Sequence, residues 1–150
     1  MKTTLALLGA MMLVLPLSAW AALGGDISSV EADTAQSGGT VRILKMTTHS
    51  VHEIRTASGV MVREYVSPAG KVFGVAWQGQ ANPDLRQVLG KYYDQLTAAS
   101  RSSSSPVRGR PLIVQQPNLV VQMTGTMRAH FGRAYDPNLL PPQIQPATIR

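Results

Sequence analysis

The chain has 150 residues, no cysteine, three histidines and a formal net charge of +6 at pH 7. This length suits one domain with one hydrophobic core. The lack of cysteine excludes disulfide bonds and the common cysteine-rich zinc sites, so stability has to come from packing. The basic charges are scattered and no aromatic-flanked RNA-binding motif is present, so we expect no specific nucleic-acid binding.

The N-terminus has the pattern of an export signal. Lys2 precedes an apolar run over residues 5–17, and Ala-Trp-Ala at 19–21 has the small-x-small form that signal peptidase reads. The apolar run is shorter than the roughly 20 residues that span a bilayer, which disfavours the alternative of an uncleaved anchor. We expect cleavage after Ala21, no transmembrane span in the mature chain, and a product in the periplasm or secreted.

Residues 40–77 predict a meander of four strands, because β-branched and aromatic residues alternate with short polar breaks. The breaks "ASG" (57–59) and "PAG" (68–70) end in glycine, which suits turns whose last residue takes a positive φ. The expected strands are 41–46, 51–56, 60–67 and 71–77.

The turns and the charges together predict the register of both hairpins. In the first hairpin we expect three pairs, and a slip by one residue would place Glu53 against Glu64. The first hairpin's predicted pairs are Ile54 with Val62, Glu53 with Arg63, and His52 with Glu64. The second hairpin's predicted pairs are Val66 with Val72, Tyr65 with Phe73, and Glu64 with Gly74.

Strand 71–77 is apolar on both faces, with Phe73, Val75 and Trp77 expected on one and Val72, Gly74 and Ala76 on the other. Strands of this kind are normally covered on both sides. The small residues of the second face predict a closely packed helix against it.

That helix is expected at 83–98. Asn82 is a good N-cap, Pro83 fits the first helical position, and Asp84 complements the helix dipole. Gly90 costs roughly 1 kcal/mol relative to alanine inside a helix, so it marks either a close contact or a tolerated glycine. One apolar stripe follows helical spacing: Leu85, Val88, Leu89, Tyr92 and Leu96.

The remaining chain contains further strands and three segments of low packing potential. Residues 112–135 predict strands with a turn at Thr124-Gly125, which completes one α+β domain at 40–135 with an antiparallel sheet of six or seven strands on one helix. Residues 22–39 and the Ser- and Arg-rich loop 100–111 predict flexible segments. Four prolines predict an extended tail at 136–150.

Several sequence segments identify a family resemblance: "VHEI", "VREYVSPAGKVFGVAWQG", "PDLRQVLG", "LVVQ" and "MRAHFGRAY" followed by "LLPP". Together they resemble the proteobacterial domain-of-unknown-function 2844 family, from Ala22 to Pro142, with an extra Ser-rich run at 102–105. The resemblance implies an exported protein of uncharacterised activity and supplies no catalytic residues. It also points to a protein partner, because members are often encoded beside another uncharacterised exported family.

Candidates for chemistry are few. His52 and Glu64 form a cross-strand pair that could act as a general base, although a structural polar pair is the favoured interpretation because no nucleophile accompanies it. His49 and His52, with His130 as a third ligand, are the alternative of a zinc site, but their odd spacing in a strand points them to opposite faces. Ser67 is interpreted as a turn residue. We therefore expect no enzyme, no cofactor and no metal.

Three classes of function remain open. The favoured one is a non-catalytic binding or assembly accessory for another exported protein, with Trp77 as a candidate contact; an aromatic platform with Tyr65 and Phe73 is a further option, less favoured than a core role. The second is electrostatic binding of an envelope polyanion or anionic lipid. The third is a small hydrolase or metal-dependent enzyme that uses His52 and Glu64. The basic residues of the second class are Lys71, Arg101, Arg108, Arg110, Arg128 and Arg133.

Overall fold

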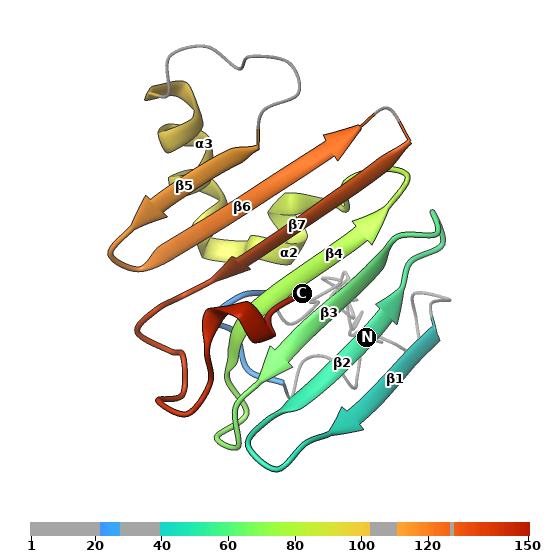
Figure 1. Cartoon of the computed structure of the whole chain (residues 1–150), viewed down its shortest axis with the longest axis vertical. Helices are drawn as coiled ribbons and strands as arrows, with labels where there is room; N and C mark the ends of the chain where they lie inside the picture. Colours follow the sequence, from blue (N-terminus) through green and yellow to red (C-terminus); the bar gives the residue numbers. More distant parts are fainter. Residues whose placement is uncertain (1–21, 28–39, 103–110, 127) are drawn as a thin grey trace, which may run out of the picture.

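The computed structural model describes residues 22–27, 40–102, 111–126 and 128–150. They form a seven-stranded antiparallel sheet in the order β1-β2-β3-β4-β7-β6-β5, with helices on one face (Figure 1). This confirms the α+β fold. The strands are β1 (Thr40–Lys45), β2 (Ser50–Arg55), β3 (Met61–Val66), β4 (Val72–Gly79), β5 (Leu112–Gln116), β6 (Leu119–Thr126) and β7 (Ala129–Tyr135).

The helical elements are α2 (Leu85–Leu89), η1 (Gly90–Tyr92) and α3 (Tyr93–Ser102), which follow one another, and a short 3-10 turn, η2 (Pro146–Thr148), near the C-terminal end. None of the helices in the described ranges is long and apolar enough to cross a membrane. The signal peptide expected at 1–21 lies outside the described residues.

The first hairpin has the predicted register. Ile54 pairs with Val62, and both Glu53–Arg63 and His52–Glu64 are cross-strand pairs. Gly59 closes the turn with a φ of 81°, which glycine adopts at little steric cost. Turn chemistry and the opposite charges were therefore sufficient to fix this register.

The second hairpin departs from its predicted register after the first pair. Val66 pairs with Val72 as expected, but Tyr65 then faces Gly74 instead of Phe73, because a bulge inserts one residue into β4. Phe73 consequently packs with Ala76, away from the Val75 and Trp77 side where the simple alternation placed it.

The turn predicted at Thr124-Gly125 is wrong. Gly125 lies inside β6, opposite His130 of β7, and the chain reverses only after Thr126. A Cβ at Gly125 would lie 2.7 Å from the His130 ring. This glycine therefore makes room for a cross-strand neighbour and does not mark a turn.

The predicted helix forms, but its N-cap and its interior differ from the prediction. Asp84, not Asn82, is the N-cap, because its carboxylate accepts hydrogen bonds from the amides of Arg86 and Gln87 at 3.0 and 3.3 Å. Gly90 has a φ of 52°, ends α2 as its C-cap and begins η1, and a Cβ there would lie 2.6 Å from the Ala22 side chain. The close contact, one of the two alternatives for Gly90, is present.

Two apolar clusters cover the two faces of the sheet. On the helix face, Val62, Val75 and Trp77 pack against Val88, Leu89, Tyr92 and Leu96, so the predicted stripe is core. The opposite face, called the groove face below, carries Arg63, Tyr65, Gly74, Ala76 and Arg133 and is covered in part by residues 136–150, called the C-terminal segment (Figure 1).

The cover over Gly74 and Ala76 is therefore this segment and not a helix, which corrects the prediction. A Cβ on Gly74 would lie 2.6 Å from Cδ1 of Ile149, and the Ile149 side chain is fully buried. The small residues of β4 do mark a close approach, as expected. The approaching element came from a part of the sequence that predicted a loose tail.

Both flanking segments thus contribute to the core. Within the first, Leu23 is buried and residues 22–27 form main-chain hydrogen bonds with β4, α2 and the turn before β4. Within the second, the Asp136 carboxylate accepts hydrogen bonds from the Tyr92 hydroxyl and from Asn138. The flexible segment expected at 22–39 and the tail expected at 136–150 do not hold for these residues; 28–39 and 103–110 lie outside the described ranges.

Candidate binding groove

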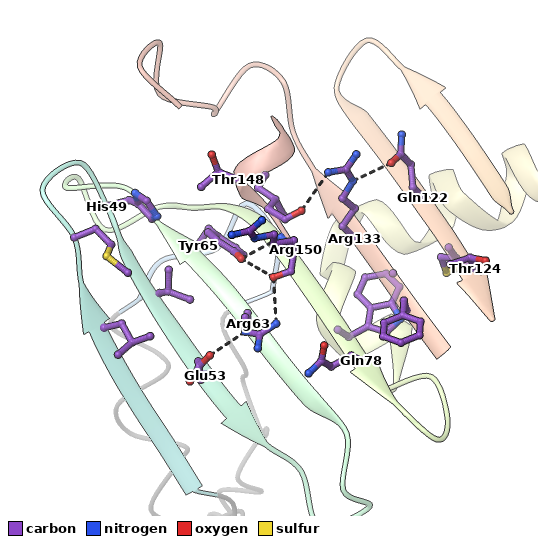
Figure 2. A pocket seen from close by; sticks show the side chains of 18 of the residues that line it. His49, Glu53, Arg63, Tyr65, Gln78, Gln122, Thr124, Arg133, Thr148 and Arg150 are labelled. Atoms are coloured by element: carbon purple, nitrogen blue, oxygen red, sulfur yellow. Dashed lines mark hydrogen bonds and ion pairs between the residues drawn. The ribbon is translucent and has the colours of Figure 1, made fainter. Parts of the chain in front are cut away.

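The groove face is only partly covered, and an open groove of about 1350 Å³ runs across it beside the C-terminal segment (Figure 2). Its walls come from the β1–β2 turn on one side and from β5, β6 and β7 on the other. The lining residues from the central strand β4 are Trp77 and Gln78, and side chains of the neighbouring strands complete the groove. The polar residues labelled in Figure 2 are His49, Glu53, Arg63, Tyr65, Gln78, Gln122, Thr124, Arg133, Thr148 and Arg150.

Arg63 joins the sheet to the C-terminal segment. Its Nε donates to Oε1 of Glu53 across the β2–β3 ladder at 2.9 Å, and its Nη1 donates to the main-chain oxygen of Arg150 at 3.2 Å. The charge pair predicted from the register is thus part of the groove. It holds the guanidinium in one orientation, since both ends of the fork are engaged.

Arg133 has the same role from β7. Its Nε donates to Oε1 of Gln122 at 2.8 Å, and its Nη1 donates to the main-chain oxygens of Pro146 and Ile149 at 3.1 and 3.3 Å. Two arginines on opposite sides of β4 therefore bind carbonyl groups of one short peptide segment (Figure 2).

Tyr65 completes this set of contacts. Its hydroxyl donates to the Arg150 oxygen at 2.9 Å and accepts from the Arg150 amide at 3.1 Å. The ring lies near Phe73 and near His49, with the His49 and Tyr65 ring centroids 6.0 Å apart. Burial lowers the pKa of His49 below its ordinary value, so the neutral imidazole is favoured beside these rings.

Apolar side chains stay exposed on the walls of the groove. Met46, Ile113 and Phe131 are 52%, 55% and 49% exposed. Among the described lining residues, the cationic side chains on the groove face are Arg63, Arg133 and Arg150, and the acidic one is Glu53; Lys45 borders the groove from a helix-face row. The groove thus combines exposed apolar surface with an excess of cationic groups, which suits a ligand that offers both apolar and anionic groups.

The predicted catalytic pair lies elsewhere. His52 and Glu64 are cross-strand neighbours, as expected, but both side chains are buried in the sheet rows of the helix face, opposite the groove. Burial raises the pKa of Glu64 to about 8, so its neutral form is favoured at neutral pH. The structure brings the pair together but does not place it in the groove.

The three histidines considered for zinc are not brought together. His49 lies in the β1–β2 turn on the groove side, His52 is in β2 on the helix face, and His130 lies opposite Gly79 at the other end of the sheet rows. Among the described residues no group of three or more histidine or acidic side chains could hold a metal ion.

The basic candidates are dispersed. Arg101 is in α3, Arg128 lies in the turn between β6 and β7, and Lys71 precedes β4, where its ammonium pairs with Asp26 at 2.9 Å. Among the basic candidates within the described ranges, Arg133 alone lines the groove. Arg108 and Arg110 lie outside the described residues.

The aromatic candidates are divided between the two faces. Trp77 borders the groove but is buried, with its Nε1 donating to Asn82 at 3.2 Å, and its ring lies against Gly132. Trp77 belongs to the helix-face cluster, whereas Tyr65 and Phe73 pack on the groove face. Ser67 is a turn residue, since its hydroxyl accepts from the Lys71 amide at 3.2 Å. The three rings therefore do not form one platform.

Sequence reasoning missed Arg63, Arg150 and Phe131 as groove residues. Arg63 was assigned only a pairing role, although its alternation with Tyr65 in β3 places both on the face of the small residues Gly74 and Ala76. Isolated large apolar residues in the proline-rich segment, Ile144 and Ile149, were the signal that it packs against the sheet, since both are buried.

The fold and the groove define a class: an α+β protein whose seven-stranded sheet is covered by helices on one face and presents a partly covered groove on the other. The chain belongs to the family described as "Protein of unknown function (DUF2844)", whose model matches residues 19–149. This confirms the resemblance seen in the sequence. Comparisons with curated proteins and with solved structures found no match.

Proposed function

We propose that the chain is a non-catalytic binding protein that assists another exported protein in the bacterial envelope, and that the groove is its contact surface. The observation that supports this most strongly is the groove itself, in which Ile113 and Phe131 are exposed beside Arg63 and Arg133. Aromatic residues and arginine are enriched at protein interfaces, and a few such residues usually provide most of the binding energy.

Affinity purification of the mature protein from its native envelope, under gentle crosslinking and at low and high salt, tests this proposal. We expect one protein to be recovered reproducibly with the wild type and lost with Phe131→Ala. Ile43→Ala is the matched control, because Ile43 is 44% exposed but lies in a helix-face row of the sheet. Recovery of no protein, or equal loss with both variants, would contradict the proposal.

The second candidate is electrostatic binding of an envelope polyanion or an anionic lipid, favoured by Arg63, Arg133 and Arg150 in the groove. Exposed charge pairs are screened within about 10 Å at 0.1 M salt. Recovery of polyanion or lipid alone, lost as salt rises, would favour this candidate over the protein partner.

A further inference from the structure

We infer that the groove accepts an extended, acidic polypeptide segment of the partner, whose apolar side chains contact Phe131 and Ile113. The inference rests on the proposed function and specifies the partner's chemistry. It is carried by three features of the groove face: its hold on the chain's own backbone, its charge, and its exposed apolar residues.

The groove face already binds a peptide segment of this chain. The bound stretch is the 3-10 turn η2 with the extended residues Gln145 and Ile149 on either side of it. Main-chain oxygens of Pro146, Ile149 and Arg150 accept from Arg63, Arg133 and Tyr65. Every polypeptide has main-chain oxygens, so hydrogen bonds from these side chains can bind a segment whatever its side chains are. The remaining groove lies alongside this segment, where a second extended chain would meet the same strands.

The charge of the groove selects the side chains of that second chain. Glu53, the one acidic side chain among the described lining residues, is engaged by Arg63, whereas Arg150 is exposed. Arg63 and Arg133 are already hydrogen-bonded to Glu53 or Gln122 and to the C-terminal segment, so they add positive charge to the lining in fixed positions, and the exposed Arg150 is the side chain we expect to contact a carboxylate directly. Aspartate and glutamate side chains are complementary to this lining.

The exposed apolar residues of the groove provide the contact surface for apolar side chains of the partner segment. Phe131 faces Thr124 across the β6–β7 ladder and Ile113 faces Gln122 across the β5–β6 ladder, so both project from the groove face at its far wall. An aromatic ring that is half exposed in the free protein gains most from burial under a partner side chain. An extended segment can meet the cationic floor and this wall at once because alternate residues point to opposite sides.

Selection from a displayed library of short random peptides tests the inference directly. We expect the wild-type protein to enrich sequences that combine Asp or Glu with aromatic or aliphatic residues, and a synthetic peptide of that consensus to bind the variants Arg150→Glu and Phe131→Ala roughly tenfold more weakly. Arg101→Glu is the matched control, because Arg101 is exposed on α3 and lies outside the groove, and it should bind like the wild type. Thermal unfolding of each variant verifies that it is folded.

Enrichment of basic or purely apolar peptides, or equal affinity of Arg150→Glu and Arg101→Glu, would overturn the inference. Preferential binding of vesicles rich in anionic lipid over the consensus peptide would overturn it in favour of a membrane. The two proposals can fail separately. If a native partner is recovered from the envelope and Arg150→Glu does not weaken its binding, the proposed function stands and the acidic segment is contradicted. If acidic peptides are selected but no native partner is recovered, the acidic segment stands and the proposed function is contradicted.

Discussion

At the scale of single residues, Glu64 is a carboxylic acid in an apolar environment. It is 1% exposed and lies in the sheet row of His52 and Val75, and no hydrogen-bond partner of its Oε2 is found among the described residues. Burial disfavours the charged form, which is why the pKa rises from 4.5 to about 8. The folded state therefore holds a proton that the unfolded chain has already lost over this interval.

This arrangement predicts a pH-dependent stability. Because the pKa of the Glu64 carboxyl is raised on folding, its contribution to the free energy of unfolding is fully present below pH 4.5. As the pH rises toward 8 the free energy of unfolding falls, by up to a few kcal/mol. Glu64→Gln has a similar shape and no charge, so the difference in unfolding free energy between variant and wild type should grow in favour of the variant from pH 4.5 to 8. Denaturant unfolding at several pH values measures it; parallel curves would contradict the prediction.

Ile149 shows how one residue fixes the C-terminal segment. It is fully buried, and its side chain occupies the space above Gly74 that any other residue at that position would fill. The main-chain contacts of Arg133 and Tyr65 lie directly beside it. Packing and hydrogen bonding therefore act on the same short stretch.

Ile149→Ala should reduce the free energy of unfolding by about 2–5 kcal/mol, because it removes buried apolar atoms and leaves a cavity over Gly74. Ile43→Ala, at a 44% exposed isoleucine, should lower it far less. Urea denaturation of both variants provides the comparison. Equal effects of the two substitutions would show that the segment does not pack as described.

At the scale of elements, Gly90 gives the helical region its interrupted form. The residue combines a φ of 52° with a ψ of −125°, a backbone conformation that residues other than glycine rarely adopt. Its Cα also faces the Ala22 side chain, which an added Cβ would meet at 2.6 Å. The break lets α2 and α3 both keep their apolar residues on the sheet while the 22–27 segment passes close by.

For Gly90→Ala, the sequence and the structure therefore predict changes of opposite sign in the free energy of unfolding. Helix propensity alone would make Gly90→Ala stabilising by about 1 kcal/mol. The positive φ and the 2.6 Å approach to Ala22 make it destabilising, by about 1–3 kcal/mol. Gly59→Ala is the control, because it has the same kind of φ and open space around it, so thermal unfolding should show a smaller loss there. A stabilised Gly90→Ala variant would refute the interpretation.

At the scale of the whole molecule, burial of the strands decreases from the centre of the sheet to its edges. β4 is central and is buried on both faces, by the helices on one and by the C-terminal segment on the other. β1 and β5 are the edge strands, and both carry exposed residues along their length. Stability against local opening should follow this gradient.

Hydrogen exchange of the native protein tests this gradient. We expect the amides of β4 that pair with β3 and β7 to exchange most slowly, at a free energy close to that of global unfolding, and those of β1 and β5 to exchange faster. In Ile149→Ala, protection should fall most in β4. Uniform protection across all seven strands would contradict the layered arrangement.

The sequence by itself determined the local order of this protein. Alternation predicted the strands, glycines at 59 and 70 predicted the turns, and the Glu53–Arg63 pair predicted the first register. The apolar stripe predicted the helix, and the specific wording of several segments identified the family. These features depend on residues close in the chain, whose spacing is visible in the sequence.

Only the tertiary structure decided which distant segments cover the sheet. The bulge at Phe73 moved a side chain to the other face, since a one-residue insertion reverses the alternation that follows it. The C-terminal segment, with four prolines and no regular strand, packs through isolated residues such as Ile149, which carry no period to detect. The groove exists because that segment covers one part of the face and leaves Phe131 and the arginines beside it accessible.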